Sequence, residues 1–304
     1  MNSKAKGAIY GTVAAISYGM NPLFTLPLYA ESMSVDSVLF YRYALAIIVI
    51  AIVMKIKKES FALRTKEIFP LMILGLLFSM SSLCLFQSYH YMDAGIASTI
   101  LFVYPVMVAI IMALFFKEKL SLITILSIML ALLGIALLYK GGDNGKPLST
   151  IGIILVLLSS LAYALYIVGV NRSSLKELSG LKLTFYALVF GLSIYIVRLH
   201  FCTHLGLVTS PISWTYIIAL AVIPTVISLL FTTLSAHHIG STATAILGAL
   251  EPVTALFFGV LLFGEQLTIR LIIGISMIIA AVSLIIIGQK TLKKMSMVLQ
   301  ITKK

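Results

Sequence analysis

Charged residues are scarce in this 304-residue chain, and acidic residues are the scarcer kind. Only 11% of the residues are charged, with 22 Lys and Arg against 10 Asp and Glu, whereas 61% are hydrophobic and the mean hydropathy is +1.11. A soluble domain of this length has too little interior to bury so much apolar surface. The composition therefore excludes a sizeable soluble domain and indicates a polytopic membrane protein.

Cysteine and the usual cofactor motifs are also missing or nearly so. Cys84 and Cys202 lie in unrelated apolar surroundings, which argues against a disulfide framework and against a metal site. The sequence contains neither a His-Glu-x-x-His zinc motif nor a Gly-x-x-x-x-Gly-Lys-[Ser/Thr] phosphate loop. We expect no cofactor, no metal and no ATP-driven step.

Apolar runs of about 20 residues, the length that crosses a bilayer as a helix, fill the chain. A helix satisfies its own backbone hydrogen bonds, which lipid cannot do for it. The sequence therefore predicts an all-α integral membrane protein with ten transmembrane helices. Their approximate ranges are 7–29, 35–54, 67–89, 94–116, 120–139, 150–170, 181–199, 214–235, 241–263 and 267–288.

The basic residues orient these helices. With the N-terminus in the cytoplasm, the cytoplasmic segments hold most of the 22 Lys and Arg residues, and the external ones hold only Lys140, Lys146, Arg198 and Arg270. Because cytoplasmic loops are enriched in Lys and Arg, both termini are expected in the cytoplasm of a multi-pass protein of the cell (inner) membrane. The positive charge then serves topology and attraction to anionic lipid, and we expect no nucleic-acid partner.

The chain also carries an internal repeat. A shift of 147 residues places Pro252-Val253 on Pro105-Val106 and Glu265 on Glu118, and the register continues to Gly288 over Gly141. Five helices per half is an odd number, so the second half is expected to be inverted relative to the first. The predicted divisions are a first repeat at 1–141, an external linker at 142–149, a second repeat at 150–290 and a basic cytoplasmic tail at 291–304.

Several of the predicted helices contain proline. A proline lacks the N–H that would bond the carbonyl one turn earlier, and lipid tolerates the freed carbonyl only where protein or a watery cavity receives it. The helix-breaking positions are Pro22, Pro105, Pro224 and Pro252. Membrane helices carry more proline than soluble ones in any case, but the paired Pro105 and Pro252 favour a cavity among helices one, four, eight and nine.

Two motifs occur at matching places in the two halves. They are Tyr104-Pro105-Val106 with Glu118-Lys119-Leu120-Ser121, and Glu251-Pro252-Val253 with Gly264-Glu265-Gln266-Leu267-Thr268. With ten helices in two halves, they resemble the EamA branch of the drug/metabolite transporter superfamily. The first motif departs from the second by Lys117 in place of Gly264. The resemblance implies a membrane carrier for a small metabolite, often an amino acid or a derivative, without indicating which one.

Glu251 is the first candidate for a functional group. It lies about ten residues from either end of its predicted helix, where an ionised acid costs about 2.5–3.5 kcal/mol on insertion scales unless it is paired or hydrated. It could bind substrate or accept a coupling proton, since burial favours the protonated acid. It could instead belong to a structural hydrogen-bond network beside Pro252.

Arg42 is the second candidate, about seven residues into its predicted helix. It could extend its side chain toward the membrane surface, or pair with an acid such as Asp36, Asp93 or Glu251. It could also hold a substrate carboxylate in a two-pronged contact.

Uncharged side chains complete the set of expected substrate contacts. Tyrosine and amide groups can bind the ends of a zwitterion, although packing is the commoner role for each. The residues are Tyr18, Asn21, Gln87, Tyr104, Tyr163, Tyr166 and Thr232. His90 and His237 also match in the 147-residue register, but each lies at a helix end, as interfacial residues do.

These observations favour a secondary transporter that moves a small polar organic metabolite by alternating access, with the lipid bilayer as its other partner. Proton coupling and a monomeric state are both compatible with the sequence. One alternative is a flippase for lipid-linked headgroups with a similar fold. An intramembrane enzyme is disfavoured, because Glu251 has no second deep acid or histidine cluster beside it.

Overall fold

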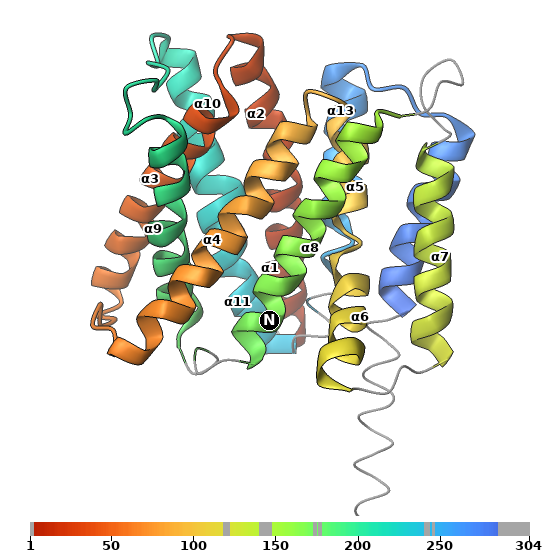
Figure 1. Ribbon diagram of the computed structural model, residues 1–304, viewed down its shortest axis with the longest axis horizontal. Helices are drawn as coiled ribbons and strands as arrows, with labels where there is room; N and C mark the ends of the chain where they lie inside the picture. Colours follow the sequence, from red (N-terminus) through yellow and green to blue (C-terminus); the bar gives the residue numbers. More distant parts are fainter. Residues whose placement is uncertain are drawn as a thin grey trace, which may run out of the picture.

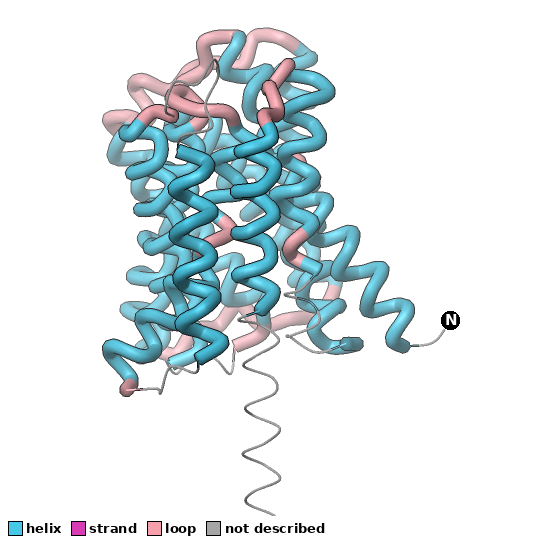
Figure 2. The backbone as a smooth tube through the Cα atoms, turned by 90° about the vertical axis from the view of Figure 1, so that its right-hand side faces the viewer, coloured by secondary structure: helices cyan, strands magenta, loops and turns pink. Residues whose placement is uncertain are grey.

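The computed structural model describes residues 3–117, 122–139, 148–172, 175, 178–239, 244 and 247–284. Throughout these residues the regular elements are helices, and no strand occurs among them. The helices stand side by side, and the loops gather mostly at the two ends of the bundle (Figure 1, Figure 2). Most of the predicted linker 142–149, the tail 291–304, and Glu118 and Lys119 lie outside the described residues.

Each of the ten predicted ranges contains a described helix. The elements are α1 (Ser3–Gly19), α2 (Asn21–Ala30), α3 (Val35–Ile56), α4 (Thr65–Ser88), α5 (Ala94–Leu101), α6 (Tyr104–Phe116), α7 (Leu122–Tyr139), α8 (Thr150–Arg172), α9 (Gly180–Arg198), α10 (Pro211–Ala221), the π-helix η3 (Val222–Ile227), α11 (Ser228–Ile239), α13 (Leu250–Phe263) and a final helix, Ile269–Leu284.

Six continuous helical segments are long and apolar enough to cross a membrane. They are Val35–Ile56, Thr65–Ser88, Ala94–Phe116, Thr150–Val170, Gly180–Arg198 and Pro211–Ala236, and shorter apolar helices lie at Leu122–Leu138, Leu250–Phe263 and Ile269–Leu284. The predicted helix 7–29 is not one rod but the pair α1 and α2. Large apolar side chains such as Phe115, Leu132 and Phe257 are exposed on the outside of the bundle, as expected of a surface that faces lipid.

Packing brings helices from the two halves of the chain together. In the interior, α1 packs on α11 and α13, α4 packs on α8 and α9, α3 packs on α9, and α5 packs on α13. Buried side chains from most of these helices form one large apolar cluster, with Tyr43, Phe86 and Tyr195 among its largest fully buried members.

Four of the prolines mark places where the helices are interrupted, whereas Pro27 and Pro70 lie inside the continuous helices α2 and α4. Pro22 follows the break between α1 and α2, Pro105 follows the turn between α5 and α6, and Pro252 follows the turn that precedes α13. Pro224 lies inside η3. Short loop segments are visible halfway along the bundle in Figure 2.

Every carbonyl that these four prolines free, four residues before each, has a donor. Asn21 Nδ2 donates to the Tyr18 carbonyl at 2.8 Å, and Ser160 Oγ donates to the Leu101 carbonyl at 3.1 Å. The Gly248 carbonyl accepts from the backbone N–H of Glu251 at 2.9 Å. The helix breaks are thus closed by specific side-chain and backbone donors, as a lipid environment demands.

Arg42 takes part in the hydrogen bonding at the Pro224 break. Thr225 Oγ1 donates to the Leu220 carbonyl that Pro224 frees, at 3.1 Å, and accepts from Arg42 Nε at 2.9 Å. The guanidinium also lies 5.1 Å from the centre of the Phe86 ring, a cation–π distance. The pairing of Arg42 with Asp36 considered above is not formed: Asp36 pairs with Arg198 at 2.6 Å.

We expect Arg42 and Thr225 to be energetically coupled. Thr225→Val and Arg42→Gln should each lower the free energy of unfolding, because each removes one side of a buried hydrogen bond to a charged group. The double variant should recover about 1–3 kcal/mol relative to the sum of the two losses. The measurement is a double-mutant cycle on the protein unfolded in mixed micelles.

Lys182→Gln is the control partner for Thr225→Val. The Lys182 ammonium donates to the Ala62 carbonyl in another contact, so the two losses should add. Additive losses for Arg42→Gln with Thr225→Val would contradict the coupling.

Candidate functional site

A cavity of about 300 Å³ lies at the level where the helices are interrupted. Residues of α1, α2, α4, α5, α6, α8, α11 and α13 line it, together with Phe102 in the turn before α6. Its polar side chains carry hydroxyl groups, apart from the amide of Asn21 and the acid of Glu251. The hydroxyl-bearing residues are Tyr18, Tyr89, Ser98, Tyr104, Tyr163, Ser228, Thr232 and Thr244.

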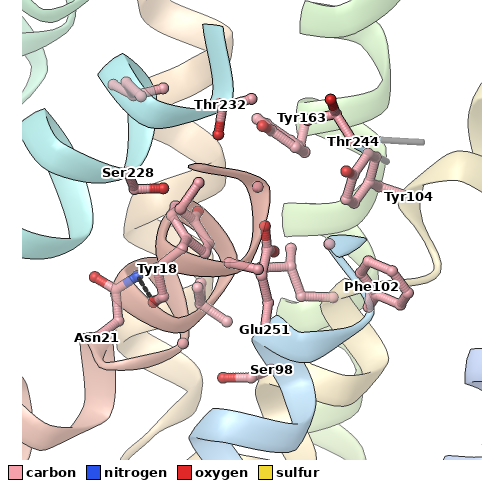
Figure 3. A pocket seen from close by; sticks show the side chains of 18 of the residues that line it. Tyr18, Asn21, Ser98, Phe102, Tyr104, Tyr163, Ser228, Thr232, Thr244 and Glu251 are labelled. Carbon is pink, nitrogen blue, oxygen red and sulfur yellow. Dashed lines mark hydrogen bonds between the residues drawn. The ribbon is translucent and has the colours of Figure 1, made fainter. Parts of the chain in front are cut away.

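Glu251 is the second residue of α13, and its carboxyl group points into the space between Tyr18 and Tyr104 (Figure 3). The N-terminal end of a helix favours a negative group. None of the described residues forms a hydrogen bond or an ion pair with this carboxyl group. The carboxyl group is therefore left for whatever occupies the cavity.

Gly19 brings α1 close enough to complete this arrangement. A Cβ atom at Gly19 would lie 2.5 Å from the backbone oxygen of Glu251 and 2.7 Å from Thr254 Cβ. Only the absence of a side chain lets the end of α1 cross α13 at this point. The close crossing places Tyr18 beside Glu251.

Asn21 contributes a second polar group with free capacity. Its Nδ2 donates to the Tyr18 carbonyl, which fixes the orientation of the amide, and its side chain is buried with the residue 3% exposed. Among the described residues, nothing donates to its Oδ1. A buried acceptor without a donor is costly, so this oxygen is suited to a ligand or a water molecule.

Aromatic rings form the opposite side of the cavity. Tyr104 and Tyr163 meet edge to face, with ring centres 4.7 Å apart and planes at 80°, and Phe102 meets Tyr104 at 6.2 Å and 86°. Figure 3 shows Phe102 and Tyr104 across the carboxyl group from Tyr18. Aromatic rings thus lie on both sides of Glu251, the one acid among the described lining residues.

Three of the predicted contacts do not line the cavity. Arg42 is engaged by Thr225 as described. Tyr166 stacks behind Tyr163 at 5.9 Å with planes at 11°, so it supports the wall from outside. Gln87 lies near the end of α4 and is not among the lining residues.

The two histidines that match in the repeat do not line the cavity as described. The side chain of His237 lies outside the described part of the chain, and exposed His90 stacks on Tyr29 at 4.6 Å.

Sequence reasoning missed several lining residues, among them Tyr89, Ser98, Phe102, Ser228 and Thr244. Two of them carried a usable signal. Phe102 lies three residues before Pro105, in the break itself, and Ser228 lies one turn after Pro224. No proline break adjoins Tyr89, Ser98 or Thr244, so the sequence gives no comparable indication for them.

Glu265 fixes α5, one of the helices that line the cavity, from the connector that follows α13. Its Oε1 and Oε2 accept the backbone N–H of Gly95, in the first turn of α5, at 3.1 and 3.3 Å. A Cβ atom at Gly95 would lie 2.6 Å from Oε2, and one at Gly259 would lie 2.3 Å from it. The carboxyl group thus occupies a slot between two glycines.

The same burial changes the proton affinity of Glu265. The pKa of Glu265 is raised from 4.5 to about 7, chiefly by burial and also by the charge of Asp93, while hydrogen bonds from the Gly95 and Ala94 N–H groups act in the opposite direction. Between these two pH values the folded protein holds a proton that the unfolded chain has released. The stability this proton confers is complete below pH 4.5 and is lost as the pH rises through about 7.

We therefore expect the melting temperature of the protein to fall from about pH 5 to about pH 8, and Glu265→Gln to flatten that dependence. The glutamine oxygen can still accept the Gly95 N–H but does not titrate. Gln266→Ala, a change at the exposed neighbouring residue, serves as the control and should keep the wild-type profile. An unchanged slope in Glu265→Gln would exclude this carboxyl group as its source.

Comparison with known proteins agrees with this architecture. The chain is 28% identical over 190 residues to an uncharacterized transporter of Archaeoglobus fulgidus, covering 62% of this chain and 66% of that protein. It is 27% identical over 208 residues to the uncharacterized transporter YxxF of Bacillus subtilis, covering 68% of this chain and 66% of the relative. The uncharacterized transporter YcbK of the same organism is 23% identical, with 89% of each chain covered.

A solved crystal structure shares the fold, with a TM-score of 0.68 at 14% identity, covering 95% of this chain and 99% of that one. The model of the EamA-like transporter family matches residues 5–140 and again residues 150–287, nearly the whole chain. With its apolar helices, broken at prolines around one cavity, this integral membrane protein belongs to the EamA-like transporter family.

Proposed function

We propose that this protein is a secondary transporter that moves a small polar organic metabolite, such as an amino acid or a related compound, across the cell membrane. The observation that carries the proposal is the cavity at the helix breaks and, inside it, the carboxyl group of Glu251, which bonds to none of the described residues. An intramembrane acid that faces a cavity, rather than a protein partner, is typical of a substrate or ion pathway. The family and its uncharacterized transporter relatives agree with this class of function.

The mechanism we propose is alternating access between two inverted five-helix repeats, 1–141 and 150–290. The caps of α6 and α13 support the repeat. Lys117 and Gly264 both end their helices in the left-handed conformation, at φ 54° and 69°. Their N–H groups donate to the carbonyls of Met112 and Gly259, which have the same spacing of 147 residues.

Helix packing supports the same symmetry. The contact of α1 with α11 has its counterpart in α8 with α4, and the contact of α13 with α1 has its counterpart in α6 with α8. Exchanging the two halves thus maps these helix pairs onto each other. Figure 1 shows α6 ending at the bottom of the bundle and α13 ending at the top, the opposite directions that an inverted repeat requires.

We assign substrate contact to the predicted residues that line the cavity, namely Tyr18, Asn21, Tyr104, Tyr163, Thr232 and Glu251.

The two ends of the cavity differ. Gly11 of α1 and Ala236 of α11 extend the lining toward the end of the bundle where α1 begins. At the opposite end, Tyr29 stacks on His90 and donates to the Phe86 carbonyl at 3.1 Å. With the N-terminus in the cytoplasm, we propose that this stack closes the outer side of the cavity.

The inverted repeat predicts that Lys117 and Gln266 lie on opposite sides of the membrane. In a background with Cys84→Ser and Cys202→Ser, Gln266→Cys should react with a membrane-impermeant maleimide in intact cells. Lys117→Cys should react only after permeabilisation. Both positions are exposed ends of connectors, so access is limited by the membrane alone. Labelling of both from one side would contradict the inversion and the mechanism built on it.

Alternating access makes a second prediction, for the middle of the cavity. Ser98→Cys in the same background should react with a small charged thiol reagent applied to either side of the membrane, since the cavity opens to each in turn. Leu132→Cys, whose position is 57% exposed on the lipid-facing surface, should stay unreactive because a thiolate does not form in lipid. Reaction of Ser98→Cys from one side alone would indicate a cavity that does not alternate.

A further inference from the structure

The described lining of the cavity carries formal charge of one sign only, which is negative. Among its described lining residues, Glu251 is the only one with a formal charge, and no Lys, Arg or His is present. The neighbouring positions 240–243, 245 and 246 carry no ionisable side chain in the sequence either. A substrate carboxylate would therefore meet an acid with no basic partner among the described lining residues; the side chain of His237, next to the lining residue Ala236, lies outside the described part of the chain.

Arg42 does not change this balance. Its field reaches Tyr18, but its Nε is bonded to Thr225 and it is not part of the lining. A carboxylate in the cavity would be separated from the guanidinium by the cavity wall. The direct fork-like contact that makes arginine a strong carboxylate receptor is not available there.

The rings add to the preference for a cation. Tyr18 lies on one side of the Glu251 carboxyl group, and Phe102 and Tyr104 lie on the other. Aromatic faces attract organic cations, most strongly in a site that excludes water. An ammonium group also brings three N–H donors, which suits a carboxylate that has no donor among the described residues.

Building on the proposed transport function, we infer that the substrate is a small organic cation, an amine without a carboxylate. Its ammonium binds the Glu251 carboxylate between Tyr18 and Tyr104, and its apolar part lies against Phe102, Leu85 and Leu101. The cavity volume of about 300 Å³ limits the ligand to a small molecule. The amine distinguishes this inference from the broader class of amino acids and related compounds.

The test compares ligands that differ only in their charged groups. One set is 2-phenylethylamine, phenylalanine and 2-phenylethanol, and the other is pentylamine, norleucine and pentanol. Binding is measured by the shift in melting temperature of the purified protein in nanodiscs, and transport by counterflow in proteoliposomes. At least one amine is expected to bind at least about 10-fold more tightly than its matched amino acid and its matched alcohol.

Variants of the site locate the binding. Glu251→Gln should weaken the amine at least about 10-fold, because a charge-assisted bond is lost. Glu59→Gln, a matched change at an acid outside the cavity, should leave binding unchanged. Tyr104→Phe should retain the amine and Tyr104→Leu should weaken it, since the ring rather than the hydroxyl supplies the attraction. If Glu251→Gln fails to fold, the comparison of Tyr104→Phe with Tyr104→Leu still tests the inference.

Some results would overturn the inference. If neither amine binds at least about 10-fold more tightly than both its matched amino acid and its matched alcohol, the inference is overturned, while the transporter proposal stays intact. The inference is also overturned if the amine still binds as tightly to the Glu251→Gln variant, or if neither amine binds. The transporter proposal is decided separately, by the side-specific cysteine labelling, which needs no substrate.

Discussion

The structure depends on one constraint, that a carbonyl inside a membrane must find a hydrogen-bond donor within the protein. The prolines at the four helix breaks each remove a donor. Asn21, Ser160, Thr225 and the backbone of Glu251 supply the replacements. Two of these donor residues, Asn21 and Glu251, also line the cavity, so the same residues that close the breaks shape the site. The helix breaks and the cavity therefore form one structural feature of the bundle.

Arg42 and Glu251 show two ways of accommodating a charge in an apolar bundle. Arg42 is 4% exposed, bonded to a threonine hydroxyl and set over a phenylalanine ring. Its charge strengthens the hydrogen bond that closes the Pro224 break, which is a structural use. Glu251 has no such partner among the described residues and faces open space. A charged group bonded within the fold has a structural role, whereas one that faces a cavity is available to a ligand.

The candidate site was partly predictable for the same reason. Tyr18, Asn21, Tyr104 and Glu251 adjoin proline breaks, and breaks in a membrane helix point to cavities. Arg42 was chosen for its depth in a predicted helix and Tyr166 among the uncharged candidates, and neither lines the cavity: Arg42 bonds Thr225 and Tyr166 stacks on Tyr163. Ser98 and Thr244 were missed because no proline break adjoins them, and a lone hydroxyl in a membrane protein commonly bonds between helices instead of facing a cavity.

The sequence by itself determined that the chain is a helical membrane protein of two similar halves, because hydropathy and a 147-residue register are properties of residue order alone. It also indicated the four breaks, because proline removes a donor from its own backbone, although Pro27 and Pro70 lie inside continuous helices. Only the tertiary structure decided which side chains share the cavity and which partner each charge finds. Those answers depend on the rotation and crossing of helices far apart in sequence, as where Gly19 lets α1 meet α13.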